Sequence, residues 1–239
     1  MKVVIGGSTG FVGTEIIRQA LALPSITAVV GLGRRHTPVP AGSEANATKL
    51  TSVICDNFEA YSPDVKKQLQ GTDACIWTIA ITPSKHNTFP FDDVRKISRD
   101  YAVTAIKALA SGSREHGRPF RFVYVSGIGA RRDRAEAESD KFLVERGLVE
   151  YCLVRGDAES QILAFAEKSG GNVEASVARP GIIHGPGKEK RTIPGVPSIE
   201  VHDLAAAMLD QVVNGVGKDT MMHEDLVQLG QKAHPPQHY

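Results

Sequence analysis

The residues nearest the start of the chain that could do chemistry are three glycines at GxxGxxG spacing. Gly7, Gly10 and Gly13 follow an apolar run at residues 3–5 and lead directly into an amphipathic stretch. A tight strand-to-helix turn needs residues without side chains, because the backbone adopts unusual angles and must approach a pyrophosphate closely. The first N–H groups of the following helix then favour an anion. The pattern predicts a dinucleotide site, with an ordinary glycine loop as the alternative, at Gly7, Ser8, Thr9, Gly10, Phe11, Val12 and Gly13.

Two arginines stand where the second strand is expected to end. Arg34 and Arg35 follow the run at residues 30–33, and no carboxylate stands beside them. A carboxylate at this place would bind the ribose 2′-hydroxyl of NAD, whereas a guanidinium suits the 2′-phosphate of NADP. The sequence therefore favours NADP(H), with Arg34 the stronger candidate because it comes first; two surface charges are the alternative. Asp56, just after the third expected strand, is a further candidate contact, to the adenine amino group.

Short apolar runs alternate with amphipathic stretches along the chain. Near-continuous apolar runs are typical of parallel strands that helices cover on both faces. The alternation predicts an α/β fold of the Rossmann type: a doubly wound parallel sheet in a single domain, residues 1–231, with a small C-terminal substrate lobe around 183–200. Strands are expected at residues 3–5, 28–32, 52–55, 74–80, 120–126, 173–178 and 220–223. Helices are expected at residues 14–23, 62–69, 94–116, 151–168 and 203–213, with a last turn or two from residue 224.

Three segments are too irregular for strand or helix, namely residues 82–91, 127–150 and 183–199. All three leave the carboxyl ends of expected strands, which is where a doubly wound sheet binds its ligands. His86, together with the aromatic residues in 89–91, either lines a substrate pocket or is merely exposed. Residues 232–239, which include Pro235 and Pro236, are expected to be disordered.

Composition argues against several classes of function. The 28 Lys and Arg residues nearly balance the 27 Asp and Glu residues, so the basic surface of a nucleic-acid binder is not expected. No run approaches the ~18 apolar residues of a membrane span, and the first apolar run is shorter than that of a signal peptide. The three cysteines are expected to be buried, reduced thiols, which fits a cytoplasmic protein. No histidine pair has the spacing of a metal site, so no metal is expected.

Five further motifs follow the glycine turn in a fixed order. They are Thr78-Ile79-Ala80, Tyr124-Val125-Ser126-Gly127, Tyr151-Cys152-Leu153-Val154-Arg155, Arg179-Pro180-Gly181-Ile182-Ile183-His184-Gly185-Pro186 and Val201-His202-Asp203-Leu204-Ala205. Together with the glycine turn they resemble the extended and atypical short-chain dehydrogenase/reductases, and among these the compact members related to the Tat-interacting oxidoreductase. The resemblance covers nearly the whole chain. It implies that Ala80, Pro180, Ile182 and Ile183 lie against the cofactor.

The resemblance also implies a catalytic group of Ser126, Tyr151 and Arg155. In that family the tyrosine moves the proton at the substrate oxygen, the serine holds that oxygen, and a lysine four residues after the tyrosine lowers its pKa. Tyr151 and Arg155 share one helical face. Arg155 replaces the family's lysine, keeping the charge but unable to join a proton relay. A surface salt bridge to Asp157 or Glu159 is the alternative role for Arg155.

These residues favour an NADP(H)-dependent oxidoreductase that acts on a small carbonyl or alcohol substrate as a monomer or homodimer. The altered lysine, and Asp100 where extended members often carry asparagine, leave two alternatives open. One is a non-catalytic NADP(H)-binding regulator that senses redox state, and the other is an isomerase or cyclase on the same fold. The fold alone does not decide among the three.

Overall fold

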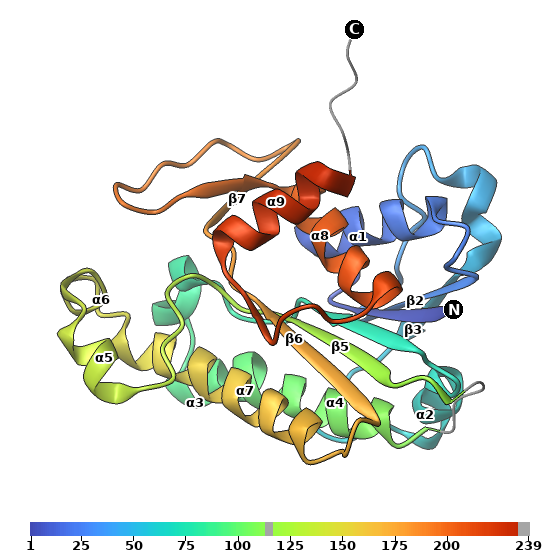
Figure 1. Cartoon of the computed structure of the whole chain (residues 1–239), viewed down its shortest axis with the longest axis horizontal. Coiled ribbons are helices and arrows are strands. Elements are labelled where there is room, and N and C mark those ends of the chain that lie inside the picture. The colour runs from blue at the N-terminus through green and yellow to red at the C-terminus, as the bar shows by residue number, and fades with distance from the viewer. Residues whose placement is uncertain (113–116, 234–239) are drawn as a thin grey trace, which may run out of the picture.

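A seven-stranded sheet runs through the centre of the protein, whose computed structural model describes residues 1–112 and 117–233 (Figure 1). The strand order is β3-β2-β1-β4-β5-β6-β9, and each neighbouring pair is parallel. The chain moves outward from β1 to β3 and then returns to β4 on the other side of β1. This confirms the Rossmann-type doubly wound fold. The strands are β1 Lys2–Gly6, β2 Ala28–Gly33, β3 Leu50–Ile54, β4 Ala74–Trp77, β5 Phe120–Val125, β6 Val173–Ala178 and β9 Thr220–Met221.

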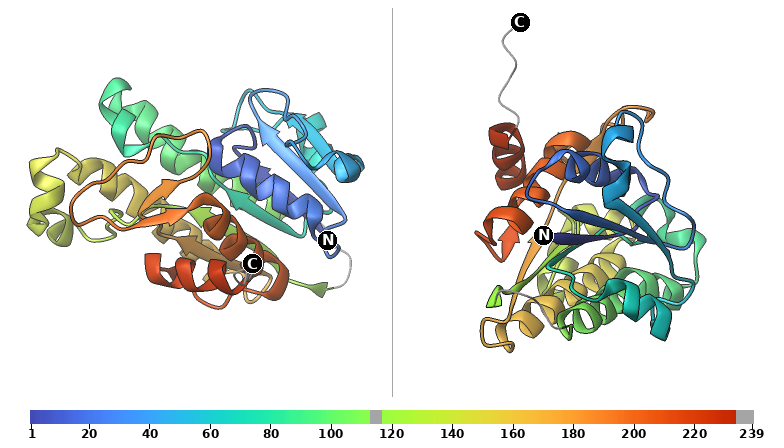
Figure 2. Two further views of the ribbon diagram at one scale, coloured as in Figure 1. Left: turned by 90° about the horizontal axis from the view of Figure 1, so that it is seen from above. Right: turned by 90° about the vertical axis from the view of Figure 1, so that its right-hand side faces the viewer.

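Helices cover both faces of the sheet, as Figures 1 and 2 show. On one face α1 Phe11–Ala22, α8 Val201–Asn214 and α9 His223–Ala233 bury one apolar cluster against the strands. On the other face α2 Pro63–Leu69, α4 Tyr101–Ala110 and α7 Val149–Glu167 bury a second. Successive side chains of a strand point to opposite faces, so each central strand contributes to both clusters. This explains the near-continuous apolar runs in the sequence.

The predicted helix over residues 94–116 is three consecutive stretches. An α-helix, α3 Phe91–Arg95, passes into a π-helical segment, η3 Lys96–Asp100, and then into α4, which ends at Ala110. Residues 113–116 lie outside the described residues. Apolar periodicity located this helix but could not reveal the π-helical turn, because one inserted residue shifts the pattern only slightly.

The segments predicted to be irregular contain short elements. Residues 127–150 hold α5 Arg134–Ser139 and α6 Lys141–Glu145, and residues 82–91 hold the 3₁₀ helix η2 Pro83–Thr88. The carboxylates of Asp133 and Asp140 accept backbone N–H groups at the starts of α5 and α6. Side-chain caps of this kind stabilise helices too short to show periodicity. Another 3₁₀ helix, η1 Glu44–Lys49, precedes β3.

The region predicted as a substrate lobe, residues 183–200, stands off the main sheet. Two short parallel strands, β7 Ile182–His184 and β8 Ser198–Glu200, pair with each other and enclose the loop between them. The expectation of disorder from residue 232 was wrong for Lys232 and Ala233, which complete α9. That helix starts one residue before the predicted turn and spans 11 residues. Residues 234–239 lie outside the described part of the chain.

No helix within residues 1–112 and 117–233 is long and apolar enough to cross a membrane. The three cysteines, Cys55, Cys75 and Cys152, are free and buried, as predicted. Burial raises the pKa of the Cys152 thiol to about 11, so the thiol stays protonated at neutral pH.

Candidate functional site

The glycine turn lies at the point where the strand order reverses, between β1 and β4. Gly7 has φ +85, and a Cβ built on it would lie 2.4 Å from Thr78 Oγ1. A Cβ on Gly13 would lie 2.3 Å from the Gly7 carbonyl oxygen. Gly10 differs, since a Cβ built on it would meet, among the described residues outside its chain neighbours, that same carbonyl alone, at 3.1 Å. The first and last glycines are therefore needed by the fold, and the middle one faces open space.

The other residues of the glycine turn differ in the contacts that their side chains make. Ser8 is buried, and its hydroxyl makes a 2.6 Å hydrogen bond with Thr37 Oγ1, so its side chain is occupied within the protein. Phe11 lies beneath Lys188, whose Nζ is 5.4 Å from the ring centroid. Val12 and Ile183 pack together with the core cluster under α1. The half-buried Thr9 has no hydrogen bond through its side chain among the described residues.

Arg34 and Arg35 lie directly after β2, and both are exposed. Neither forms an ion pair with any residue that the structure describes. The turn that carries them is anchored at Thr37, whose backbone N–H donates to Ser52 Oγ at 2.8 Å. Two cations are thus displayed on a fixed turn at the strand end. Asp56, two residues after the end of β3, is likewise exposed.

The ends of β5 and β6 continue side by side beyond the sheet. The Ser126 N–H donates to the Ala178 carbonyl at 2.8 Å, and the Ile128 N–H donates to the Pro180 carbonyl at 2.9 Å. These bonds hold the segment that begins at Ser126 against the segment that leads into β7 and Ile182. The Ser126 hydroxyl is buried and has no hydrogen-bond partner among the described residues. A buried hydroxyl without a partner is uncommon, and a ligand oxygen is one group that would satisfy it.

Tyr151 and Arg155 both face the sheet from α7 and are only 6% and 4% exposed. The Tyr151 hydroxyl donates to the Ile81 carbonyl at 2.9 Å. The Arg155 guanidinium donates to two carbonyls, that of Val125 at 2.5 Å and that of Ser98 at 3.2 Å. Among the residues described, no hydrogen bond joins Ser126, Tyr151 and Arg155 directly; Tyr151 and Arg155 each donate to different backbone carbonyls instead.

Ser98 is the centre of this polar cluster, and the sequence did not single it out. It is fully buried in the π-helical segment η3. Its hydroxyl accepts the Ile81 N–H at 3.1 Å, and its carbonyl accepts both Arg155 and the Tyr124 hydroxyl, the latter at 2.8 Å. A π-helical turn displaces carbonyls from the regular helical ladder, which frees them for such bonds. Asp100, by contrast, pairs with the neighbouring Arg99.

The alternative role for Arg155, a salt bridge to Asp157 or Glu159, was wrong. Asp157 pairs with Arg99 at 2.9 Å, and Glu159 pairs with two other arginines. The Arg155 guanidinium carbon instead lies 4.8 Å from the centroid of the Tyr124 ring. Carbonyl oxygens and an aromatic face compensate part of the desolvation of this buried cation.

Burial sets the pKa of Tyr151. Desolvation raises it above the ordinary tyrosine value, and the nearby Arg155 charge opposes that rise only in part. In the family mechanism the pKa of the catalytic tyrosine is lowered. The pKa of Tyr151 in this structure is shifted the opposite way.

Glu159 is a buried anion that holds the start of the Arg179–Pro180 segment. It is 0% exposed, and both of its oxygens accept from Arg179, with the shortest contact at 2.5 Å. Arg132 donates to the same carboxylate at 2.8 Å and to Thr220 Oγ1 at 2.8 Å. One carboxylate thereby connects α7 to the residues that precede Pro180.

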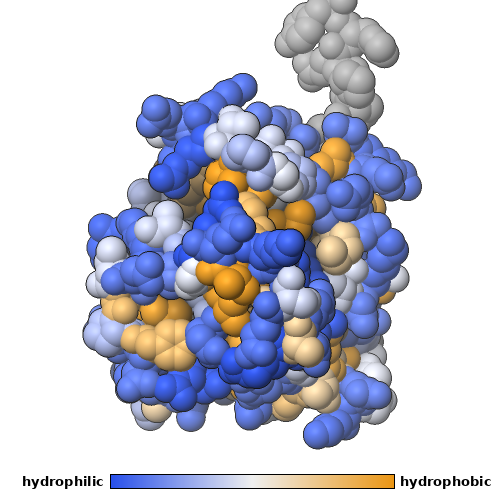
Figure 3. All heavy atoms as spheres, turned by 90° about the vertical axis from the view of Figure 1, so that its left-hand side faces the viewer, coloured by the Kyte–Doolittle hydropathy of each residue, from blue (hydrophilic) through white to orange (hydrophobic). Residues whose placement is uncertain are grey.

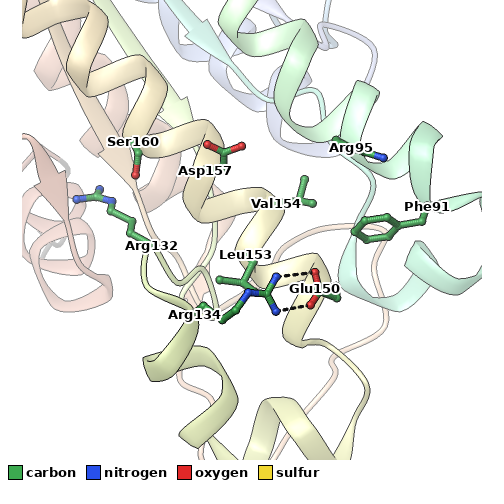
Figure 4. A pocket seen from close by; sticks show the side chains of 9 residues that line it. All are labelled: Phe91, Arg95, Arg132, Arg134, Glu150, Leu153, Val154, Asp157 and Ser160. Carbon is green, nitrogen blue, oxygen red and sulfur yellow. Dashed lines mark hydrogen bonds and ion pairs between the residues drawn. The ribbon is translucent and has the colours of Figure 1, made fainter.

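The carboxyl edge of the sheet faces the viewer in Figure 3, where separate groups of apolar residues lie between polar ones. Ala80, half-buried, lies in the segment that leaves β4 at this edge. No group of three or more His, Cys, Asp or Glu side chains that could hold a metal was found among the described residues. An open groove of about 550 Å³ lies elsewhere, between α3, α7 and residues 132–134. The Arg134–Glu150 ion pair lines this groove, and Tyr151 is not among its lining residues (Figure 4).

A family model described as NAD(P)H-binding matches residues 7–214. The chain belongs to this family. The match begins at Gly7 of the glycine turn and extends to the last residue of α8, so the family includes both the turn and the polar cluster around Ser98.

Curated relatives are distant. Leucinostatins biosynthesis cluster protein T of Purpureocillium lilacinum is 28% identical over 140 residues, a match that spans 56% of this chain and 46% of that protein. Protein FMP52, mitochondrial, of Candida albicans is 28% identical over 189 residues, 79% of this chain and 70% of the relative.

Solved structures share the fold. Vestitone reductase from alfalfa superposes with a TM-score of 0.66 at 19% identity, covering 98% of this chain and 82% of the reductase. The NAD-bound dTDP-glucose 4,6-dehydratase DesIV from Streptomyces venezuelae has a TM-score of 0.69 at 13% identity, with 98% and 80% covered. The oxidoreductase ylbE from Lactococcus lactis has a TM-score of 0.60 at 19% identity and is covered over 100% of both chains. This chain therefore shares the fold of these three proteins.

Proposed function

We propose that this protein is an NADP(H)-dependent oxidoreductase that transfers hydride to or from a small carbonyl or alcohol substrate. The observation that supports it most is the Ser126 hydroxyl, buried and without a partner among the described residues. It lies at the carboxyl end of β5, next to Val125, whose carbonyl binds Arg155. An unpaired donor in the residue after a carbonyl that binds a buried cation suits a substrate oxygen on which negative charge develops.

The proposed roles follow from these positions. A bound nicotinamide supplies or accepts the hydride. Ser126 donates a hydrogen bond to the substrate oxygen, and Tyr151 gives that oxygen its proton during reduction, once its hydroxyl leaves the Ile81 carbonyl. Arg155 is held by Ser98 and Val125, and its charge favours the tyrosinate that remains. Ala80, Pro180, Ile182 and Ile183 would lie against the bound cofactor, and Asp56 would contact its adenine.

The exposed pair Arg34 and Arg35 predicts a preference for NADPH. NADPH should bind at least ~10-fold more tightly than NADH, because one charge-assisted phosphate contact contributes about 1.5–3 kcal/mol. Arg34→Ala should remove most of that difference. Isothermal titration calorimetry with both cofactors measures it, and Arg95→Ala, which changes an arginine in α3, is the matched control. Equal affinities of the unmodified protein for NADPH and NADH would contradict the prediction.

Gly10→Val tests the phosphate turn. The backbone of Gly10 has φ −83, which valine adopts, and its Cβ would meet only the Gly7 carbonyl. The variant should therefore fold, while its side chain occupies the space proposed for the pyrophosphate and blocks binding of NADPH. Gly217→Val, whose Cβ would meet only Gln211 Oε1 at 3.9 Å, is the control. A folded Gly10→Val protein with unchanged NADPH affinity places the phosphate site elsewhere.

A non-catalytic NADP(H)-binding regulator is the second candidate. The observation that favours it is the Tyr151 hydroxyl, which is bound to the Ile81 carbonyl and has a raised pKa. The two candidates are separated by a screen of small aldehydes, ketones and quinones with NADPH oxidation as the signal. If the protein turns over no member of the panel, and Tyr151→Phe leaves every cellular phenotype unchanged, the regulator replaces the enzyme.

We also infer a cytoplasmic protein, a monomer or homodimer, related within its family to the compact Tat-interacting members. Fungal relatives carry the word mitochondrial in their names, so cell fractionation is the test of location. Light scattering at several concentrations measures the oligomeric state.

A further inference from the structure

His86 belongs to the 3₁₀ helix η2, and its ring packs against the ring of Tyr151 in α7. Within the described part of the chain its imidazole makes one hydrogen bond. Nδ1 lies 2.7 Å from the Pro83 carbonyl oxygen. A carbonyl can only accept, so Nδ1 carries a proton in this contact. In the neutral imidazole the other nitrogen, Nε2, then holds a lone pair and acts as an acceptor. The turn thus fixes which nitrogen can receive a hydrogen bond.

That acceptor has no donor within residues 1–112 and 117–233. Nε2 is buried and without a hydrogen-bond partner among the described residues. The imidazole and the Tyr151 ring pack with centroids 5.6 Å apart and planes tilted by 50°. The Ser126 hydroxyl is likewise buried and unpaired. Buried polar atoms without a partner are few in native proteins. Among the described residues the others are those of Tyr61 and Trp77, which lie within the apolar core, whereas the His86 nitrogen lies beside the ring of the proposed proton donor Tyr151.

We propose that His86 is a substrate-contacting residue whose Nε2 accepts a hydrogen bond from a hydroxyl or amino group next to the reacting carbonyl. This rests on the proposed oxidoreductase function and narrows its substrate class to carbonyl compounds with a donor on the neighbouring carbon. Ser126 donates a hydrogen bond to the carbonyl oxygen, and Tyr151 gives that oxygen its proton. His86, stacked on Tyr151, receives the second polar group of the same small molecule.

The turn that carries His86 is suited to admitting such a ligand. Most of its side chains are exposed, and it joins the chain at Thr82 and Phe89, which are exposed as well. Its internal bonds, such as that from Thr88 Oγ1 to the Lys85 carbonyl at 2.7 Å, keep its shape. A small outward movement of the whole turn would uncover Nε2 without breaking the bond to Pro83.

Two ketones of similar shape test the preference for a hydroxyl group on the carbon next to the carbonyl. The probes are 2-hydroxyacetophenone and propiophenone, which carry a hydroxyl and a methyl group at the same place. The unmodified protein with NADPH should show at least a ~10-fold higher kcat/KM for the hydroxyketone, which corresponds to about 1.4 kcal/mol. His86→Phe keeps an aromatic ring and removes both nitrogens, so the ratio should fall toward the intrinsic reactivity ratio of the two ketones, which exceeds one because the hydroxyl withdraws electrons from the carbonyl. His86→Gln can place a carbonyl oxygen near the position of Nε2 and should restore part of the ratio.

Lys85→Ala, which alters an exposed side chain of the same turn, is the control and should keep the ratio. A ratio near one in the unmodified protein overturns the proposal. So does a ratio that His86→Phe leaves in place, or one that His86→Gln and His86→Phe lower equally, since the last result indicates a structural role.

A binding measurement separates this proposal from the function on which it rests. With NADP⁺ bound no reduction occurs, and the ¹⁵N resonance of His86 Nε2 reports directly on hydrogen bonding. The resonance should move on addition of 2-hydroxyacetophenone and not on addition of propiophenone. If neither ketone is turned over but this shift is seen, the oxidoreductase function fails and the His86 contact stands. If the hydroxyketone produces no shift, the contact is refuted whatever the turnover.

Discussion

Tyr151→Phe should lower turnover by roughly 10²–10⁴-fold, the usual contribution of a positioned proton donor or acceptor. The substitution removes only the hydroxyl, which donates to the Ile81 carbonyl in the resting state. The ring, its contact with His86 and the packing of α7 remain. The measurement is kcat with NADPH and the best substrate of the carbonyl panel, alongside the affinity for NADPH, which should be unchanged.

The stability of the variant needs its own measurement. Loss of the bond to Ile81 should reduce the free energy of unfolding by about 1 kcal/mol, because an intramolecular hydrogen bond contributes roughly that much. Rates should therefore be compared well below the melting temperature of the variant. A fall in kcat of less than about tenfold in a folded protein would mean that another group moves the proton.

Arg155→Lys completes this test. The guanidinium reaches the Val125 and Ser98 carbonyls together, and a single ammonium on a shorter stem does not reproduce that fork. We expect kcat of the Arg155→Lys variant to be lower than that of the unmodified protein, although the substitution restores the family's usual residue. A faster variant would mean that the site still operates the family's ordinary mechanism and that arginine hinders it.

Glu159→Ala should destabilise the protein by about 3–5 kcal/mol. Removing one partner of a buried ion pair leaves uncompensated charge, which costs about that much. Glu159 is the carboxylate shared by Arg179 and Arg132, so its loss leaves Arg179, only 14% exposed, without a counter-ion in this cluster. Urea unfolding followed by circular dichroism measures the change in the free energy of unfolding.

Glu150→Ala is the matched control for this prediction. Glu150 lies on the same helix and pairs with an arginine, Arg134, but both side chains are more than half exposed. Exposed ion pairs contribute little, so the control should lose far less stability than Glu159→Ala. If the two variants lose the same stability, the Glu159 cluster is no more important to the fold than a surface pair. Weakened NADPH binding by folded Glu159→Ala protein would further indicate that the carboxylate orders the Pro180 segment.

Much of the fold could be read from short-range patterns. The glycine turn, the six long strands of the sheet and the helices α1, α2, α7 and α8 were all located, with ends that differ by a few residues. Each depends on interactions between residues close in the sequence or on simple apolar periodicity. The glycines illustrate this well, because Gly7 needs a positive φ for reasons local to one turn. The class of fold and the position of the glycine turn could therefore be predicted without coordinates.

The polar cluster around Ser98 was accessible only in part. Tyr151 and Arg155 were expected on one helical face, and both do face the sheet. The partners of these residues were not foreseen, since the Arg155 guanidinium bonds to carbonyls 57 and 30 residues away and the Tyr151 hydroxyl to one 70 residues away. Every residue has a carbonyl, so residue types carry no signal for such bonds. The packing of η3, β5 and the segment after β4 against α7 determines which carbonyls accept hydrogen bonds from these side chains. The same packing buries Tyr151, and this burial raises its pKa although the neighbouring charge of Arg155 lowers it.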